Sequence, residues 1–185
     1  MNHQDRLSKI RENLGLIHLI CGDGKGKTTA AAGLAVRARG SGLSVRFVQF
    51  LKGGTSAELG PLKDLGIDVR SGQPSGKFVF QMDEQEKAMT RDFHQKRLAD
   101  AFEDSKEGTD LLVLDEILGA LATGMVDESD LLALLESKPA NLEVVLTGRD
   151  PSGALLAKAD YVSEVVMRKH PYETSRTPAR PGIEY

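Results

Sequence analysis

The feature that most constrains this chain is the loop Gly22-Asp23-Gly24-Lys25-Gly26-Lys27-Thr28-Thr29, which follows an apolar run and precedes an alanine-rich segment. Glycines let successive backbone N–H groups converge on phosphate oxygens, and the N-terminus of the following helix adds favourable partial charge. In such loops the lysine reaches the outer phosphates and the adjacent hydroxyl binds Mg²⁺. We therefore expect the whole loop, with Lys27 and Thr28 at its centre, to bind a nucleoside triphosphate.

The loop is a variant of the common phosphate-binding pattern. In G-x-x-x-x-G-K-[ST] the first glycine lies five positions before the second, and here Cys21 occupies that place. Because Cys21 is the only cysteine, no internal disulfide can form. We expect it to be a small buried residue rather than a reactive thiol.

Length and charge narrow the function classes. A chain of 185 residues is long enough for one well-packed domain, and its net charge of -3 lacks the basic excess of a dedicated nucleic-acid binder. Its apolar runs are too short to span a bilayer, and its N-terminal residues do not resemble a signal peptide. We therefore expect a cytoplasmic protein with neither nucleic acid nor membrane as a partner.

Apolar runs alternate with helical patterns along the chain. Strands are predicted at 14–21, 44–50, 111–114, 142–146 and 161–166, and helices at 28–40, 83–105, from 127 onward and after Asp150-Pro151. Asp150 is the predicted N-cap of the last of these helices, with Pro151 at its first position. Asp83 and Glu86 have the spacing of a capping box. The alternation predicts an α/β protein, a single-domain phosphate-loop fold with a mainly parallel, doubly wound sheet that binds ligands at the carboxyl ends of its strands.

The remaining segments are less regular. Residues 51–77 contain six glycines and two prolines, which predicts a loop-rich stretch with a binding role. The following Phe78-Val79-Phe80 is typical of a strand edge that fills the core, with an apolar ligand-facing role as the alternative. Leu7, Ile10 and Leu14 predict a short amphipathic helix within residues 1–14, and residues 167–185 have the pattern of a basic, solvated tail.

Four charged residues are candidates for the chemistry. Asp115 and Glu116 end an apolar strand, where carboxylates hold Mg²⁺ in phosphate-loop proteins, although such a pair is also a common helix start. Lys52 and Arg149 follow two other strands, where cations can meet phosphate. A solvated lysine and a surface salt bridge are the respective alternatives.

Taken together, the motifs resemble those of the phosphate-loop ATP:corrinoid adenosyltransferases, also called cob(I)yrinic acid a,c-diamide adenosyltransferases. The likeness runs nearly end to end along the chain. The segments that carry it are Gly22 to Thr29, Val48-Gln49-Phe50-Leu51-Lys52-Gly53, Val113-Leu114-Asp115-Glu116, Thr147-Gly148-Arg149, Ala159-Asp160-Tyr161-Val162-Ser163-Glu164, Lys169-His170-Pro171-Tyr172 and Gly182-Ile183-Glu184-Tyr185.

The resemblance implies that a reduced cobalt(I) corrinoid attacks the 5′ carbon of ATP and releases triphosphate. In that case Gly22 to Thr29, Lys52 and Arg149 bind ATP, while Thr28, Asp115 and Glu116 hold Mg²⁺. Phe78 and Phe80 look like the family's aromatic pair beside the corrinoid, with Phe80 where relatives carry tryptophan. The segment 1–14 looks like the family's covering helix. An electron-donating reductase and a homodimer are also implied.

Two other functions remain open from the residues alone. A phosphate loop with an acidic motif also suits an ATPase or a kinase, in which Glu116 would orient or activate the attacking group. The third possibility is a non-catalytic nucleotide or corrinoid carrier, which would bind without turnover. The fold does not choose among these, because one sheet architecture supports many functions.

Overall fold

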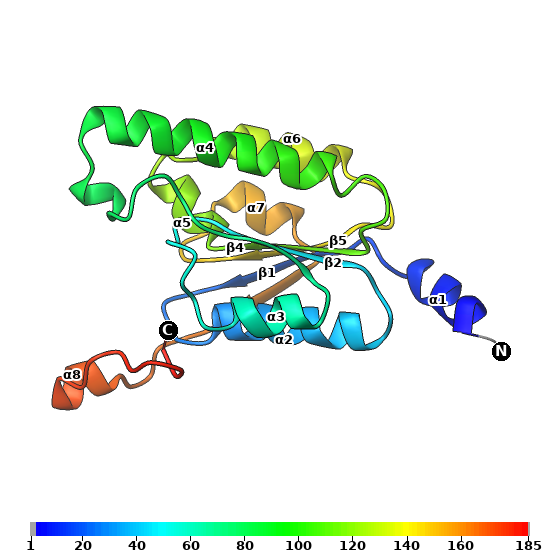
Figure 1. Cartoon of the computed structure of the whole chain (residues 1–185), viewed down its shortest axis with the longest axis horizontal. Helices are drawn as coiled ribbons and strands as arrows, with labels where there is room; N and C mark the ends of the chain where they lie inside the picture. The colour runs from blue at the N-terminus through cyan, green and yellow to red at the C-terminus, as the bar shows by residue number, and fades with distance from the viewer. Residues whose placement is uncertain (1–2, 185) are drawn as a thin grey trace.

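The computed structural model describes residues 3–184 and contains one six-stranded sheet (Figure 1). Its strands are β1 (Ile17–Cys21), β2 (Val45–Gln49), β3 (Asp68–Arg70), β4 (Leu111–Asp115), β5 (Glu143–Thr147) and β6 (Tyr161–Glu164). They are arranged in the order β3-β2-β4-β5-β1-β6, and every pair of neighbours is parallel. The predicted parallel α/β sheet is therefore confirmed.

Helices cover both faces of this sheet. The helices α4 (Glu84–Glu103), α5 (Ile117–Ala122), α6 (Glu128–Ser137) and α7 (Gly153–Lys158) lie on one face, and α2 (Lys27–Gly40) and α3 (Leu59–Asp64) lie on the other (Figure 1). All five residues of β4 are buried, because its side chains meet a helix layer on either side. Two apolar clusters follow from this layering, one on each face.

The register brings the ends of three strands together. Gln49 is aligned with Asp115 between β2 and β4, and Leu114 is aligned with Leu146 between β4 and β5. Since β5 lies between β4 and β1, the end of β5 separates the acidic pair from the glycine loop. The side chains that follow β5 therefore lie between the two predicted motifs.

The N-terminal helix does not lie over the glycine loop. The predicted helix is present as α1 (His3–Arg11), and Leu7 and Ile10 pack against the cluster on the α2 face. Arg11 donates hydrogen bonds of 2.8 and 3.0 Å to Asp110, which immediately precedes β4. This contact places α1 at the amino end of the sheet, opposite the glycine loop (Figure 1). The implied covering role is therefore not seen within this chain.

The aromatic segment is not a strand. Val79–Gln81 forms a short 3₁₀ helix, η1, and the Phe78 N–H donates to the Gln81 side chain. The loop-rich stretch before it also contains α3 and β3, which interrupt its glycines. A short apolar run does not by itself distinguish a strand from a helical turn, and here the turn formed.

Helix caps were predicted with mixed success. The Asp83 capping box at the start of α4 is confirmed, with the Asp83 carboxylate accepting from the Glu86 N–H. For α7 the cap is Ser152, not Asp150 as predicted, because Asp150 lies in the left-handed region at φ 49°. The helices α5 and α8 (Pro171–Ser175) were not predicted.

No helix among residues 3–184 combines the length and the apolar character needed to cross a bilayer.

Candidate active site

The glycine loop connects β1 to α2 and rests on the segment that follows β6. The Gly24 N–H donates a 2.7 Å hydrogen bond to the carbonyl of Val165, and the Met167 N–H donates to the Asp23 carboxylate at 2.9 Å. A Cβ atom at Gly22, where φ is 104°, would lie only 2.5 Å from the same Val165 oxygen. The first glycines are therefore required by the close approach of the backbone behind the loop.

The other side of the loop is open to a ligand. Gly26 is the N-cap of α2 at φ 114°, and neither a capping side chain nor an acidic residue occupies the first turn of that helix. The first-turn N–H groups and the helix dipole therefore favour an anion. The Lys27 ammonium donates to the Gly24 carbonyl at 2.7 Å, and burial, followed by repulsion from Arg149, lowers the pKa of Lys27.

Asp115 is buried and fully engaged by its neighbours. Its Oδ1 accepts from the Thr147 hydroxyl at 2.8 Å. Its Oδ2 accepts from the Gln49 amide at 3.1 Å and from the Lys52 ammonium at 2.8 Å. Three partners from the ends of the two flanking strands, β2 and β5, thus hold this carboxylate in place. A buried charge that is shielded from solvent needs such partners. Thr147 and Gln49 were not predicted as site residues.

Glu116 faces the cleft instead. Its backbone is left-handed, with φ 62°, and its N–H donates to the Thr147 hydroxyl at 2.8 Å. This turn of the chain separates two adjacent carboxylates, so that Glu116 lines the cleft beside Lys27 and Arg149. Burial raises the pKa of Glu116, and the neighbouring Asp115 raises it further.

A cleft of about 460 Å³ collects most of the predicted nucleotide ligands. It is lined by Asp23, Gly24, Lys25, Gly26, Lys27, Thr28, Thr29, Lys52, Glu116 and Arg149, together with residues of the C-terminal segment. The Lys52 ammonium lies 3.3 Å from the Thr28 hydroxyl and 4.0 Å from the Glu58 carboxylate. The predicted cations and the glycine loop are therefore gathered around one space.

The aromatic pair lies at the far end of a row of cavities. Phe78 and Phe80 are 68% and 82% exposed, and their rings stack with centroids 5.6 Å apart and planes 7° from parallel. With Leu51 and Val79 they line a groove of about 450 Å³. A third cavity, of about 790 Å³, is lined by Thr28 of the glycine loop and also by Phe78. This third cavity therefore adjoins both the cleft beside the loop and the groove beside the aromatic rings.

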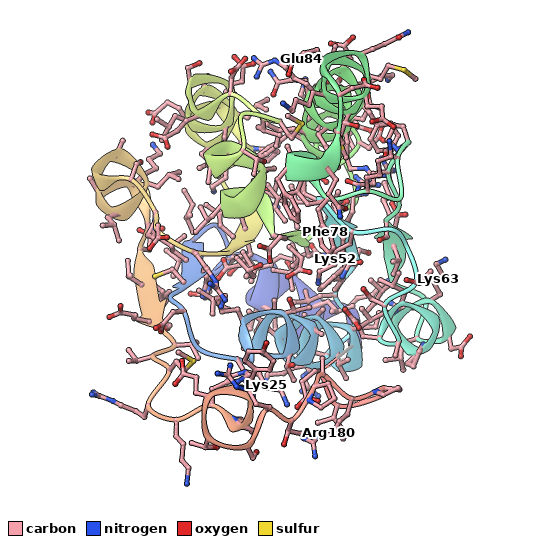
Figure 2. The ribbon with its side chains drawn as sticks, turned by 90° about the vertical axis from the view of Figure 1, so that its left-hand side faces the viewer. Lys25, Lys52, Lys63, Phe78, Glu84 and Arg180 are labelled. Carbon is pink, nitrogen blue, oxygen red and sulfur yellow. The ribbon has the colours of Figure 1, made fainter. Side chains whose placement is uncertain are left out.

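Figure 2 shows this arrangement from the carboxyl edge of the sheet. Lys52 and Phe78 lie in the middle of the view, and Lys25 and Arg180 lie below them, beside α8. Glu84 and Lys63 lie at the periphery. Lys25 and Arg180 are far apart in the sequence, and both contact Glu184.

The C-terminal segment forms one wall of the site rather than a solvated tail. The Glu184 carboxylate accepts from the Lys25 ammonium at 3.0 Å and also pairs with Arg180. The Arg180 hydrogen bonds, with help from Lys25, lower the pKa of Glu184 to about 2. Ile183 and Tyr172 line the cleft as well. The sequence signal for this wall was the closing motif at 182–185, for which no site role was predicted.

Comparison with known proteins identifies the family of this chain. The sequence model of the family "ATP:corrinoid adenosyltransferase BtuR/CobO/CobP" matches residues 13–185. The chain belongs to that family. It is 34% identical to corrinoid adenosyltransferase CobA of Salmonella typhimurium and 33% identical to a corrinoid adenosyltransferase of Escherichia coli, in both cases over 97% of this chain and 90% of the relative. A corrinoid adenosyltransferase of Pseudomonas aeruginosa is 29% identical over 98% of this chain and 89% of the relative.

The exposed aromatic pair is a feature that the fold alone does not explain. A plain nucleotide hydrolase needs the glycine loop and an acidic group, but it has no evident use for two exposed, stacked phenylalanines. Such rings would normally be buried, and large exposed apolar groups mark binding sites. The groove beside Phe78 and Phe80 thus has the character of a binding site.

Proposed function

We propose that this chain transfers the 5′-deoxyadenosyl group of ATP to the cobalt(I) of a reduced corrinoid. The cobalt electron pair forms a bond to the 5′ carbon, and the bond from that carbon to its oxygen breaks, so that triphosphate leaves. The observation that supports this most is the row of cavities from the glycine loop to the aromatic pair. It offers room for both substrates at one edge of the sheet.

The residues around the cleft suit a triphosphate leaving group. Substitution at carbon needs negative charge stabilised along all the phosphates, and fixed donors do this best. The α2 N-terminus and the side chains of Lys27, Lys52 and Arg149 provide these charges. Because cobalt is the nucleophile, the protein needs to supply no attacking side chain. An ATPase or a kinase, the alternatives from sequence, would leave the aromatic groove unused.

The donor set fits a magnesium ion. Mg²⁺ prefers hard oxygen ligands and usually binds one or two protein groups plus substrate phosphates. The Thr28 hydroxyl and the Glu116 carboxylate line the same cleft, and within residues 3–184 no group of three acidic, histidine or cysteine side chains forms a closed metal cage. We infer that Thr28 and Glu116 hold the ion, with Asp115 behind them. Bound there, the ion would neutralise part of the phosphate charge.

We further propose that Phe78 and Phe80 face the corrinoid and exclude its lower cobalt ligand. Apolar rings at that position disfavour a polar ligand, which makes reduction to cobalt(I) easier. Their exposure and their parallel stacking support this role, because two such rings already form a flat apolar surface. In the cell the electron would come from a separate reductase. We expect a cytoplasmic homodimer.

The test is an anaerobic assay with Mg-ATP and chemically reduced cobalamin. A light-sensitive adenosylated product, formed together with inorganic triphosphate, supports the transferase. Release of ADP without a change in the visible spectrum would contradict it and favour a hydrolase or kinase. Binding of both substrates with no product would indicate a carrier.

A further inference from the structure

The loop that precedes the aromatic pair is held from behind by α4. Arg97, on the inner side of that helix, donates to the carbonyls of Gln49 at 2.8 Å, Gly72 at 2.6 Å and Ser71 at 3.3 Å. Its guanidinium also lies 4.4 Å from the centre of the Phe93 ring. One side chain thus ties the end of β2 to the segment that leaves β3.

His94 makes the next connection along the same loop. It is completely buried, between the rings of Phe50 and Phe93, with centroid distances of 5.6 and 5.4 Å. Its Nε2 lies 3.3 Å from Oε1 of Gln73, and the Gln73 amide nitrogen donates to the Lys77 carbonyl at 3.2 Å.

The contact between Gln73 and Lys77 determines the direction of the hydrogen bond between His94 and Gln73. Because the Lys77 carbonyl can only accept, the nitrogen of the Gln73 amide must face it and the oxygen must face His94. Nε2 of His94 must then carry the proton. The other ring nitrogen, Nδ1, is buried and has no hydrogen-bond partner within residues 3–184. The histidine therefore makes one specific polar contact, which is directed at the loop.

We propose that His94 and Arg97 are positioning residues that place the aromatic pair for the corrinoid. This rests on the proposed function of Phe78 and Phe80. Glycines and a proline make the intervening segment intrinsically mobile, so fixing it costs conformational entropy. Arg97 holds the start of the segment, and the link from His94 through Gln73 to Lys77 holds its end, one residue before Phe78. The rings are thereby set in place before the corrinoid arrives, and less ordering remains to be done on binding.

The experiment uses a matched pair of substitutions at His94. His94→Gln keeps a donor near the position of Nε2, whereas His94→Met has a similar shape and no donor. Both are made in a Phe80→Trp background. Since the chain contains no tryptophan, this introduces a single tryptophan at the aromatic pair, which can be excited selectively. Time-resolved fluorescence anisotropy then reports loop order, quenching by hydroxocobalamin reports corrinoid binding, and calorimetry reports ATP binding.

We expect His94→Met to lower the anisotropy and weaken hydroxocobalamin binding about fivefold, the loss typical of one hydrogen bond, with ATP affinity unchanged. His94→Gln should restore both quantities. Unchanged anisotropy in His94→Met, or an equal loss of ATP affinity, would overturn the positioning role. If His94→Met does not fold, Gln73→Met removes the same link from the loop side, and the same outcomes decide.

Failure of the proposed function would look different. If the parent protein neither binds nor adenosylates a corrinoid, while the anisotropy still depends on the donor at His94, then His94 orders the loop for another ligand and the corrinoid role of the aromatic pair falls. The anisotropy and the product assay therefore separate the two proposals.

Discussion

His94 should make this protein lose stability between neutral and mildly acidic pH. Burial, helped by repulsion from Arg97, lowers the pKa of His94 from 6.5 to about 4. The folded state therefore favours the neutral imidazole, and the unfolded chain binds a proton first as the pH falls. The stabilising contribution is fully present above the unfolded pKa and is lost as the pH falls toward the folded pKa.

The size of the effect follows from these two values. At about pH 5 the unfolded histidine is almost fully protonated and the folded one is almost fully neutral. Linkage then gives a loss of about 2 kcal/mol between roughly pH 7 and roughly pH 5 from this residue alone. That is a substantial part of the roughly 5 to 15 kcal/mol that typically stabilises a domain.

The assay is urea unfolding of the wild type and of His94→Gln at the two pH values. Carboxylates titrate in both proteins, so the difference between their pH dependences isolates the histidine. We expect the wild type to lose about 2 kcal/mol more than the variant on acidification. Equal losses in the two proteins would refute the reasoning, because they would mean that the imidazole keeps an ordinary pKa in the folded state.

Three further predictions concern the site. Thr147→Val should lower the free energy of unfolding by about 3 kcal/mol, since the hydroxyl serves both the Asp115 carboxylate and the Glu116 N–H; Thr147→Ser should restore it in the same denaturation assay, and a fully stable valine variant would contradict the network. Lys27→Ala should abolish turnover and weaken ATP binding measured by calorimetry, whereas retained turnover would remove Lys27 from the chemistry. Phe80→Ala should slow the reaction most when reduction of cobalt(II) limits the rate and least with chemically prepared cobalt(I); equal losses under both conditions would count against the aromatic role.

The parts of the fold that the sequence predicted are those set by local patterns. The apolar run of β4 is buried on both faces, and the alternation of strands with helices requires parallel crossovers. The capping box at Asp83 depends on residues only three positions apart. Each of these signals lies within a few neighbouring residues, so it does not depend on how distant segments pack.

The features that were missed depend on contacts between distant segments. Nothing near Phe78 indicates that its ring stays exposed, because the chain turns into η1 and the rings stack on each other. Glu184 lies 159 positions after Lys25, which it contacts. The N-terminal helix was recognised from its pattern, but its place at the other end of the sheet is decided by Arg11 and Asp110. Local patterns identify elements, and only packing assigns them a location.

The acidic pair shows why the same limit applies to chemistry. From sequence, Asp115 and Glu116 are equivalent ends of one strand. In the fold the left-handed backbone of Glu116 points them in different directions, and Thr147 holds both, donating to one and accepting from the N–H of the other. Asp115 then serves to anchor Gln49 and Lys52, while Glu116 meets the cleft. Two adjacent carboxylates thus occupy different environments: Asp115 is anchored by its neighbours, and Glu116 faces the cleft, because the chain turns at Glu116 and Thr147 holds that turn.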